Sequence, residues 1–182
     1  MELNFINNGG YIVNLDVAKA INGDKEAFEE LIRTNKDSMY RIAKTILSNE
    51  DDIIEAMQEA TLKAYKGINK LRQKEFFKTW LFRILINECN EVYRKKNKEI
   101  IVDKEELCTI SIVDKYENMD LKNAINTLNK DMQTIINLYY YEDLSVKDIS
   151  SILNIPENTV KTNLSRARKR LYSVLKEGYI YE

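Results

Sequence analysis

The residues with the most evident chemistry are the amides, hydroxyls and cations that follow Pro156. Such groups hydrogen-bond to base edges and pair with phosphates. Those that we expect to contact a DNA duplex are Asn158, Lys161, Thr162, Asn163, Ser165, Arg166 and Lys169. They lie off an apolar stripe at helical spacing, formed by Val160, Leu164, Ala167, Leu171 and Leu175. This pattern predicts an amphipathic helix whose polar face fits a DNA major groove.

A shorter helix is expected immediately before this one. Ser145 and Asp148 resemble a capping box, and Val146, Ile149 and Ile152 then recur at helical spacing. The sequence Asn154-Ile155-Pro156 supplies the break, because proline cannot continue one helix but suits the start of the next. Residues 144–171 therefore indicate a helix-turn-helix. A solvated basic helix in an ordinary bundle is the alternative, and the agreement of turn, stripe and polar face favours DNA binding.

Charge is segregated along the chain, although the net charge is only −1. An acidic block contains Glu50, Asp51, Asp52, Glu55 and Glu59. Two basic clusters contain Arg94, Lys95, Lys96 and Lys98, and then Lys161, Arg166, Arg168, Lys169 and Arg170. Segregated charge indicates two kinds of partner, one basic and one polyanionic.

Composition argues against catalysis. The chain has no histidine, which removes imidazole bases, Ser-His nucleophiles and most zinc sites, and no glycine-rich phosphate loop is present. We therefore expect no enzyme activity, no cofactor and no metal. The two cysteines form no paired motif, and the first residues form neither a signal peptide nor a membrane span. These features predict a cytoplasmic protein without membrane insertion.

The expected fold is all-α, because 182 residues contain one proline and five glycines. We expect two small helical bundles joined by a flexible linker, the C-terminal one carrying the helix-turn-helix. The predicted ranges are an N-terminal extension at 1–14, a first bundle at 15–98, a linker at 99–117 and a second bundle at 118–182.

Within these bundles, Asn22-Gly23-Asp24 and Ser48-Asn49 predict helix breaks and caps, and Gly67 predicts a helix end. A polar connection at 68–75 precedes a long helix to about residue 98, and one helix is expected over 118–140. Trp80 has the spacing of a core residue.

The order of these features resembles one family. Residues 52–65, DIIEAMQEATLKAY, and residues 77–87, FKTWLFRILIN, followed by a basic tail, resemble bacterial RNA polymerase sigma factors of the extracytoplasmic-function (ECF) type. Residues 124–171, including TVKTNLSRARKRL at 159–171, resemble the family's promoter-reading fourth region. The resemblance implies a region 2-like domain at 15–98 and a region 4-like domain at 118–182.

The resemblance also implies roles for the acidic helix. In the family this helix binds the coiled-coil clamp helices of the largest polymerase subunit, which present arginines. The residues that match it are Asp52, Glu55, Gln58 and Glu59. Charge alone favours a solvated acidic helix start, and the family pattern shifts the expectation to a polymerase contact. Ile54 departs from the pattern, since family members often carry an acid there.

The segment from Gly67 onward matches the family's minus-10 module, which separates the DNA strands and holds an extruded base. The residues that we assign to it are Lys70, Arg72, Lys74, Phe76, Asn87, Asn90, Arg94 and Lys95. Cations suit phosphates and Phe76 suits base stacking, although Lys95 also suits a merely solvated helix end. The helix-turn-helix matches the module that reads the minus-35 element. There Asn163 replaces a common basic residue, and Arg168 and Arg170 are expected to serve packing in part.

The resemblance implies a promoter-specificity subunit whose partners are core RNA polymerase, promoter DNA and an anti-sigma factor. Two other functions remain compatible with the residues. One is a regulator that binds an operator through the same helix-turn-helix without polymerase. The other is a helical adaptor whose charged faces bind only proteins.

Overall fold

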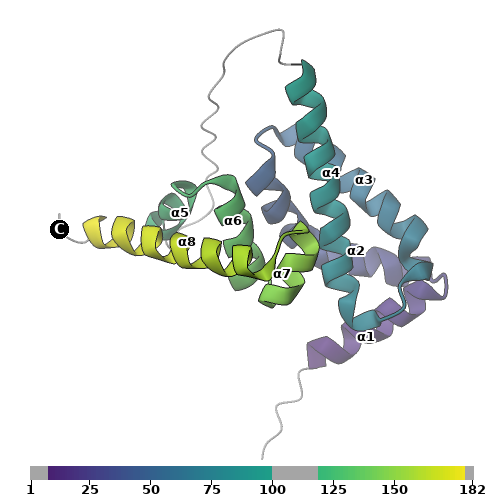
Figure 1. Cartoon of the computed structure of the whole chain (residues 1–182). Helices are drawn as coiled ribbons and strands as arrows, with labels where there is room; N and C mark the ends of the chain where they lie inside the picture. Colours follow the sequence, from purple (N-terminus) through teal and green to yellow (C-terminus); the bar gives the residue numbers. More distant parts are fainter. Residues whose placement is uncertain (1–7, 100–118, 179–182) are drawn as a thin grey trace, which may run out of the picture.

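The computed structural model describes residues 8–99 and 119–178, and every regular element in these ranges is helical (Figure 1). The first bundle comprises α1 (Asn8–Ile21), α2 (Lys25–Ile46), α3 (Glu50–Gly67) and α4 (Phe77–Glu99), with 3-10 turns at η1 (Ile68–Lys70) and η2 (Lys74–Phe76). The second comprises α5 (Met119–Asn126), α6 (Lys130–Ile136), the π turn η4 (Asn137–Tyr141), α7 (Val146–Leu153) and α8 (Glu157–Gly178). The all-α prediction is confirmed.

The helix boundaries of the first bundle follow local capping chemistry. Gly23 takes a φ of +94°, which suits glycine, and the Ala27 N–H donates to the Asp24 carboxylate over 2.9 Å at the start of α2. Asn49 accepts from the N–H groups of Asp51 and Asp52 at the start of α3. Both caps agree with the sequence. The expected linker at 99–117 falls outside the described residues except for Glu99, which belongs to α4.

The predicted N-terminal extension at 1–14 is wrong for residues 8–14, because α1 begins at Asn8. Asparagine and two glycines are poor helix formers, so local propensity argued against a helix here. Packing overrides that propensity: α1 lies along α2 and touches η1 and η2, and its Val17 and Ala20 are buried. Residues 1–7 lie outside the described residues.

Gly67 has a different role from the expected helix cap. Its φ of −107° is not left-handed, and the chain continues directly into η1. A Cβ atom at this position would lie 3.3 Å from the ring of Trp80. Glycine therefore lets α3 approach α4 closely, and Trp80, half-buried, packs against Phe77 with ring centroids 6.1 Å apart.

The second bundle contains one more helix break than the sequence predicted. The expected helix at 118–140 is interrupted after Asn126, where Asn129 caps α6 by accepting from the Met132 N–H over 2.9 Å, and it ends in a π turn. The helix-turn-helix is as expected. Ser145 caps α7, and Asn154 takes a left-handed φ of +53° in the turn before α8.

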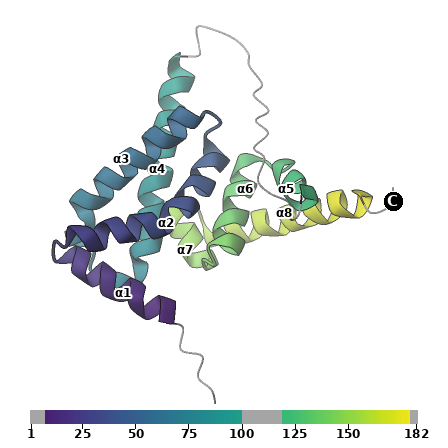
Figure 2. The same cartoon turned by 180° about the vertical axis from the view of Figure 1, so that it is seen from behind.

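The two bundles pack against each other. In both views α7 lies against α4, and α6 lies beside α2 (Figures 1 and 2). One continuous cluster of apolar side chains runs through both bundles. Helix α4 consequently has a second buried face that the sequence did not predict, where Phe82 and Ile86 are 0% and 3% exposed. In the described ranges, no helix has the length and apolarity needed to cross a membrane.

Candidate nucleic-acid and polymerase interfaces

Helix α8 presents a polar face opposite its buried stripe. Val160, Leu164 and Ala167 are buried, so the other side of the helix faces solvent. Most of the residues expected to contact DNA are exposed on this side of α8: Asn158, Lys161, Thr162, Ser165, Arg166 and Lys169. Asn163 is half-buried at the edge of this surface. The helix therefore offers a continuous surface of donors and cations that a major groove can accept.

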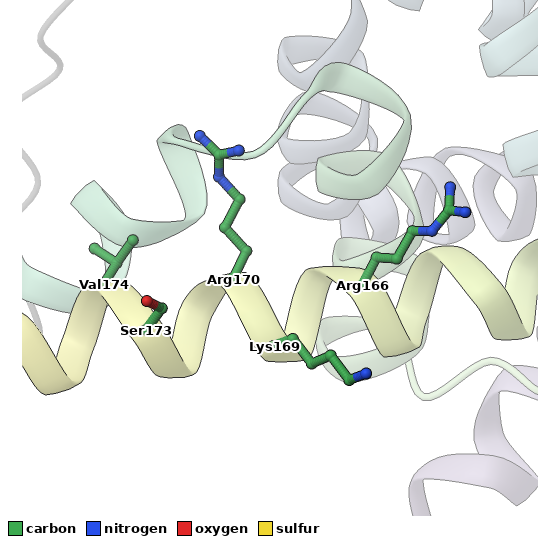
Figure 3. Close-up of a pocket in the computed structure, with 5 residues that line it drawn as sticks. All are labelled: Arg166, Lys169, Arg170, Ser173 and Val174. Carbon is green, nitrogen blue, oxygen red and sulfur yellow. The ribbon is translucent and has the colours of Figure 1, made fainter.

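The exposed cationic surface continues along α8 to Arg170, a member of the second basic cluster that was not among the expected DNA contacts. Arg166, Lys169, Arg170, Ser173 and Val174 line an open hollow of about 550 Å³ (Figure 3). Arg170 and Ser173 were not among the predicted contacts, although their spacing of four and seven residues from Arg166 places them beside it on a helix. The Arg166 and Arg170 side chains extend to one side of α8 and the Lys169 side chain to the other (Figure 3), so these cations suit successive phosphates of a DNA backbone.

Arg168 is engaged within the protein. Its Nε donates to the Tyr140 hydroxyl over 2.8 Å, and its guanidinium lies 5.5 and 5.7 Å from the ring centroids of Tyr139 and Tyr140. The hydrogen bond with Tyr140 raises the pKa of Arg168. This geometry joins α8 to η4, and it agrees with the packing role expected for Arg168.

Several residues expected to contact the minus-10 element lie on one polar face of α4. Asn87, Asn90 and Arg94 are exposed, and the Arg94 Nε donates to the Asn90 carbonyl over 3.1 Å. Arg83 is also exposed and completes a row at spacings of four, three and four residues. Sequence reasoning missed Arg83, although this spacing was visible. Lys95 is exposed but points about 100° away from Arg94 around the helix.

The connection between α3 and α4 exposes the other minus-10 candidates. Lys70, Arg72 and Lys74 face solvent around η1 and η2, and Phe76 is 47% exposed. An exposed aromatic ring between cations suits an unpaired base whose phosphates are held nearby. This connection leads directly into α4, so the loop and the polar face of α4 belong to one surface.

Asp52 occupies a different place from the other residues expected on the polymerase-binding helix. It is 7% exposed, and its carboxylate lies 2.7 Å from the Lys96 ammonium near the end of α4. Glu55, Gln58 and Glu59 are exposed on α3. The structure therefore brings three of the four residues to one surface and gives Asp52 a structural ion pair.

Apolar side chains lie among these exposed acids. Ile54 and Leu62 are 45% and 44% exposed on α3, and the sequence analysis did not assign either to a binding surface. Leu62 lies seven residues from Glu55 and three from Glu59, and so shares their face. A surface of carboxylates and aliphatic groups suits a partner helix that carries both cations and apolar side chains.

Comparisons with known proteins show which family this chain resembles. The family described as Sigma-70 region 2 matches residues 31–99, and the family described as Sigma-70, region 4 matches residues 118–171. The RNA polymerase sigma factor SigV of Bacillus subtilis is 34% identical over 140 residues, covering 76% of this chain and 84% of SigV. The ECF RNA polymerase sigma factor SigW of the same organism is 31% identical over 172 residues, covering 85% and 92%.

Solved structures show the same fold. The sigma factor RpoE of Bartonella quintana, crystallised with the anti-sigma factor NepR, superimposes with a TM-score of 0.69 and 27% identity, covering 82% of this chain and 96% of RpoE. CnrH, solved with the cytosolic domain of CnrY, gives a TM-score of 0.64 at 19% identity, covering 91% and 98%. The chain therefore belongs to the ECF sigma factors of bacterial RNA polymerase.

Proposed function

We propose that this protein binds core RNA polymerase and directs it to specific promoters, with no catalytic chemistry of its own. The observation that carries this proposal is the separation of two oppositely charged surfaces: exposed Glu55, Gln58 and Glu59 on α3, and the cations of α4 and α8. One surface suits a basic protein helix, and the others suit DNA.

The promoter is read in two places. The exposed row on α4 and the loop around Phe76 contact the unpaired minus-10 element, where bases need stacking partners. The polar face of α8 contacts the minus-35 element as duplex. Asn158, Thr162 and Ser165 offer short hydrogen-bonding groups for base edges, whereas Arg166 and Lys169 suit phosphates or guanine.

The first bundle, from α1 to α4, acts as a region 2-like unit, and the second, from α5 to α8, acts as a region 4-like unit. An anti-sigma factor controls them by covering polymerase-binding surfaces. The structure of RpoE with NepR supports this regulation, since RpoE shares 27% identity with this chain. Promoters and polymerase place the site of action in the cytoplasm.

Charge reversal on α3 tests the polymerase contact. We expect a Glu55→Lys/Glu59→Lys variant to lose core polymerase in a pull-down, because two cations would then face a basic partner. Glu26→Lys/Glu29→Lys is the matched control, since these two acids are also exposed, on α2. Circular dichroism verifies that both variants fold. Full retention of polymerase by the α3 variant would remove this face from the mechanism.

An operator-binding regulator without polymerase is the second candidate, favoured by the exposed recognition face of α8. It predicts that the purified chain alone protects a specific DNA site at physiological salt. The sigma factor proposal predicts specific protection only after core polymerase is added.

A further inference from the structure

One cation lies close to the exposed acids of α3. Lys63 follows Glu59 by four residues, and both side chains are exposed. Glutamate and lysine in this order and at this spacing ordinarily form an ion pair on the surface of a helix. No other cation lies three or four residues from Glu55 or Glu59 in either direction. Taken by itself, α3 would therefore neutralise Glu59 with its own lysine.

The ammonium of Lys63 is instead held by α4, which packs against α3 (Figures 1 and 2). Its Nζ lies 2.7 Å from each carboxylate oxygen of Glu88 and 3.8 Å from the carboxylate of Glu91. The hydrogen bond with Glu88 is the main cause that raises the pKa of Lys63, and the charges of Glu91 and Glu59 add to it. Lys63 is thus a cation that Glu59 attracts but that α4 retains.

Burial explains why Glu88 holds the lysine in preference to Glu59. Glu88 is 7% exposed, whereas Glu59 lies in solvent. A charge away from solvent is screened less, and a buried carboxylate that loses its cation is costly. Among the residues that the structure describes, neither Glu55 nor Glu59 forms an ion pair.

The carboxylate of Glu59 consequently stays available to a partner. A basic helix that approaches α3 does not first have to displace Lys63, a displacement that costs about a factor of two in affinity for an ion pair of this spacing. An ammonium held among the acids would also repel an approaching arginine. Glu88 is buried, so it acts on such a partner only through Lys63.

We propose that Glu88, supported by Glu91, is a positioning residue for polymerase binding: it holds Lys63 against α4 and so keeps Glu59 unpaired on the surface that receives core polymerase. This inference rests on the proposed function, in which Glu59 contacts the polymerase. The position of Lys63 does not depend on that function, and it is measurable in the free chain.

A variant that releases Lys63 tests its position. Glu88→Gln/Glu91→Gln, the release variant, removes both carboxylates of α4 that hold the ammonium and keeps the shape of their side chains. Zero-length carbodiimide cross-linking joins a carboxylate to an ammonium in contact with it. We expect at least about twofold more of the 59–63 link, located by peptide fragmentation, in the release variant than in wild type. Equal yields would overturn the positioning by Glu88.

The same variant tests the consequence for polymerase. We expect its Kd for core RNA polymerase, measured by fluorescence anisotropy of the end-labelled chain at low salt, to rise about twofold or more. The difference should shrink as salt screens the charges. Glu26→Gln/Glu29→Gln is the matched control, because it removes two exposed carboxylates of α2 and changes the net charge equally. An unchanged Kd of the release variant, or an equal rise in the control, would overturn the proposal.

A third substitution separates release of Lys63 from damage to the contact between α3 and α4. Lys63→Gln in the release variant removes the released cation, so we expect Kd to return to the wild-type value or to fall below it. Damaged packing would persist after this change, so a Kd that stays raised would contradict the role of Glu88.

Glu59→Gln in the wild-type background distinguishes this inference from the proposed function. We expect this variant to bind core polymerase more weakly than wild type. An unchanged Kd would refute the polymerase contact at Glu59, and with it the function proposed for this surface. A raised Kd of Glu59→Gln together with an unchanged Kd of the release variant would refute only the positioning role of Glu88.

Discussion

Two arginines of α8 offer a paired test of how this helix is used. Arg166 lines the open hollow on the exposed face, whereas Arg168 is held against Tyr139 and Tyr140. Arg166→Ala and Arg168→Ala delete the same side chain from the same helix. We expect the first to weaken promoter binding with little effect on stability, and the second to destabilise the fold with little effect on DNA.

The magnitudes follow from the contacts of each side chain. If Arg166 neutralises one phosphate, its loss reduces the slope of log affinity against log salt by about 0.9, which is about fivefold in affinity at 0.15 M salt. Arg168 makes cation–π contacts and a hydrogen bond at an exposed position. Its loss costs about 1 kcal/mol. A protein of this size then loses about 3 °C in Tm.

Both effects are measurable on the same preparations. Fluorescence anisotropy of labelled promoter DNA with the polymerase holoenzyme, titrated with salt, gives the slope, and thermal unfolding of the free chain gives Tm. Arg83→Ala is a useful comparison for the salt slope, since Arg83 is exposed on α4, the helix assigned to the minus-10 element, whereas Arg166 lies on α8. Equal salt slopes for the Arg166 and Arg168 variants would refute the division of roles derived from the structure.

Three further predictions concern buried groups. Asp52→Asn should lower the free energy of unfolding by about 1 kcal/mol, because the ion pair with Lys96 is lost, and should leave polymerase affinity in a pull-down unchanged. Reduced affinity at normal stability would instead place Asp52 on the polymerase-binding surface. Burial raises the pKa of the Cys89 thiol to about 12. In a Cys108→Ser variant, iodoacetamide at pH 8 should therefore alkylate Cys89 only when the protein unfolds. Rapid alkylation of the native protein would contradict this prediction. Burial alone would raise the pKa of Glu142, but its hydrogen bonds and cationic partners on α2 and α4 lower this pKa overall, so its contribution to stability is present above the ordinary carboxyl pKa of about 4.3 and lost as pH falls through the lowered pKa. Urea unfolding should therefore show a weaker loss of stability on acidification in Glu142→Gln than in wild type. Identical pH profiles of the two proteins would count against the prediction.

Local signals in the sequence accounted for the helix-turn-helix and for the caps at Asp24, Asn49 and Ser145. Ser145, Asn154 and Pro156 each act through their own backbone or that of near neighbours, so their types determine the turn without information from elsewhere. The same holds for Gly23 and Asp24. The residues that form the polar faces followed from helical periodicity once these ends were known.

Features set by distant contacts were not predictable in this way. Asp52 resembles its acidic neighbours in sequence, and only the return of α4 brings Lys96 to it. Phe82 and Ile86 lie on a second apolar face of α4 whose purpose becomes evident only when the other bundle covers it. Glu142 likewise gains its cationic partners from helices roughly 60 to 100 residues away in the chain.

In vitro transcription across a promoter library, with and without core polymerase, tests the central claim most directly. We predict initiation at a restricted set of promoters sharing two separated elements, only when this protein and core polymerase are both present. Protection of one DNA site by the protein alone, with no effect on where core polymerase initiates, would contradict the assignment of promoter-directing activity.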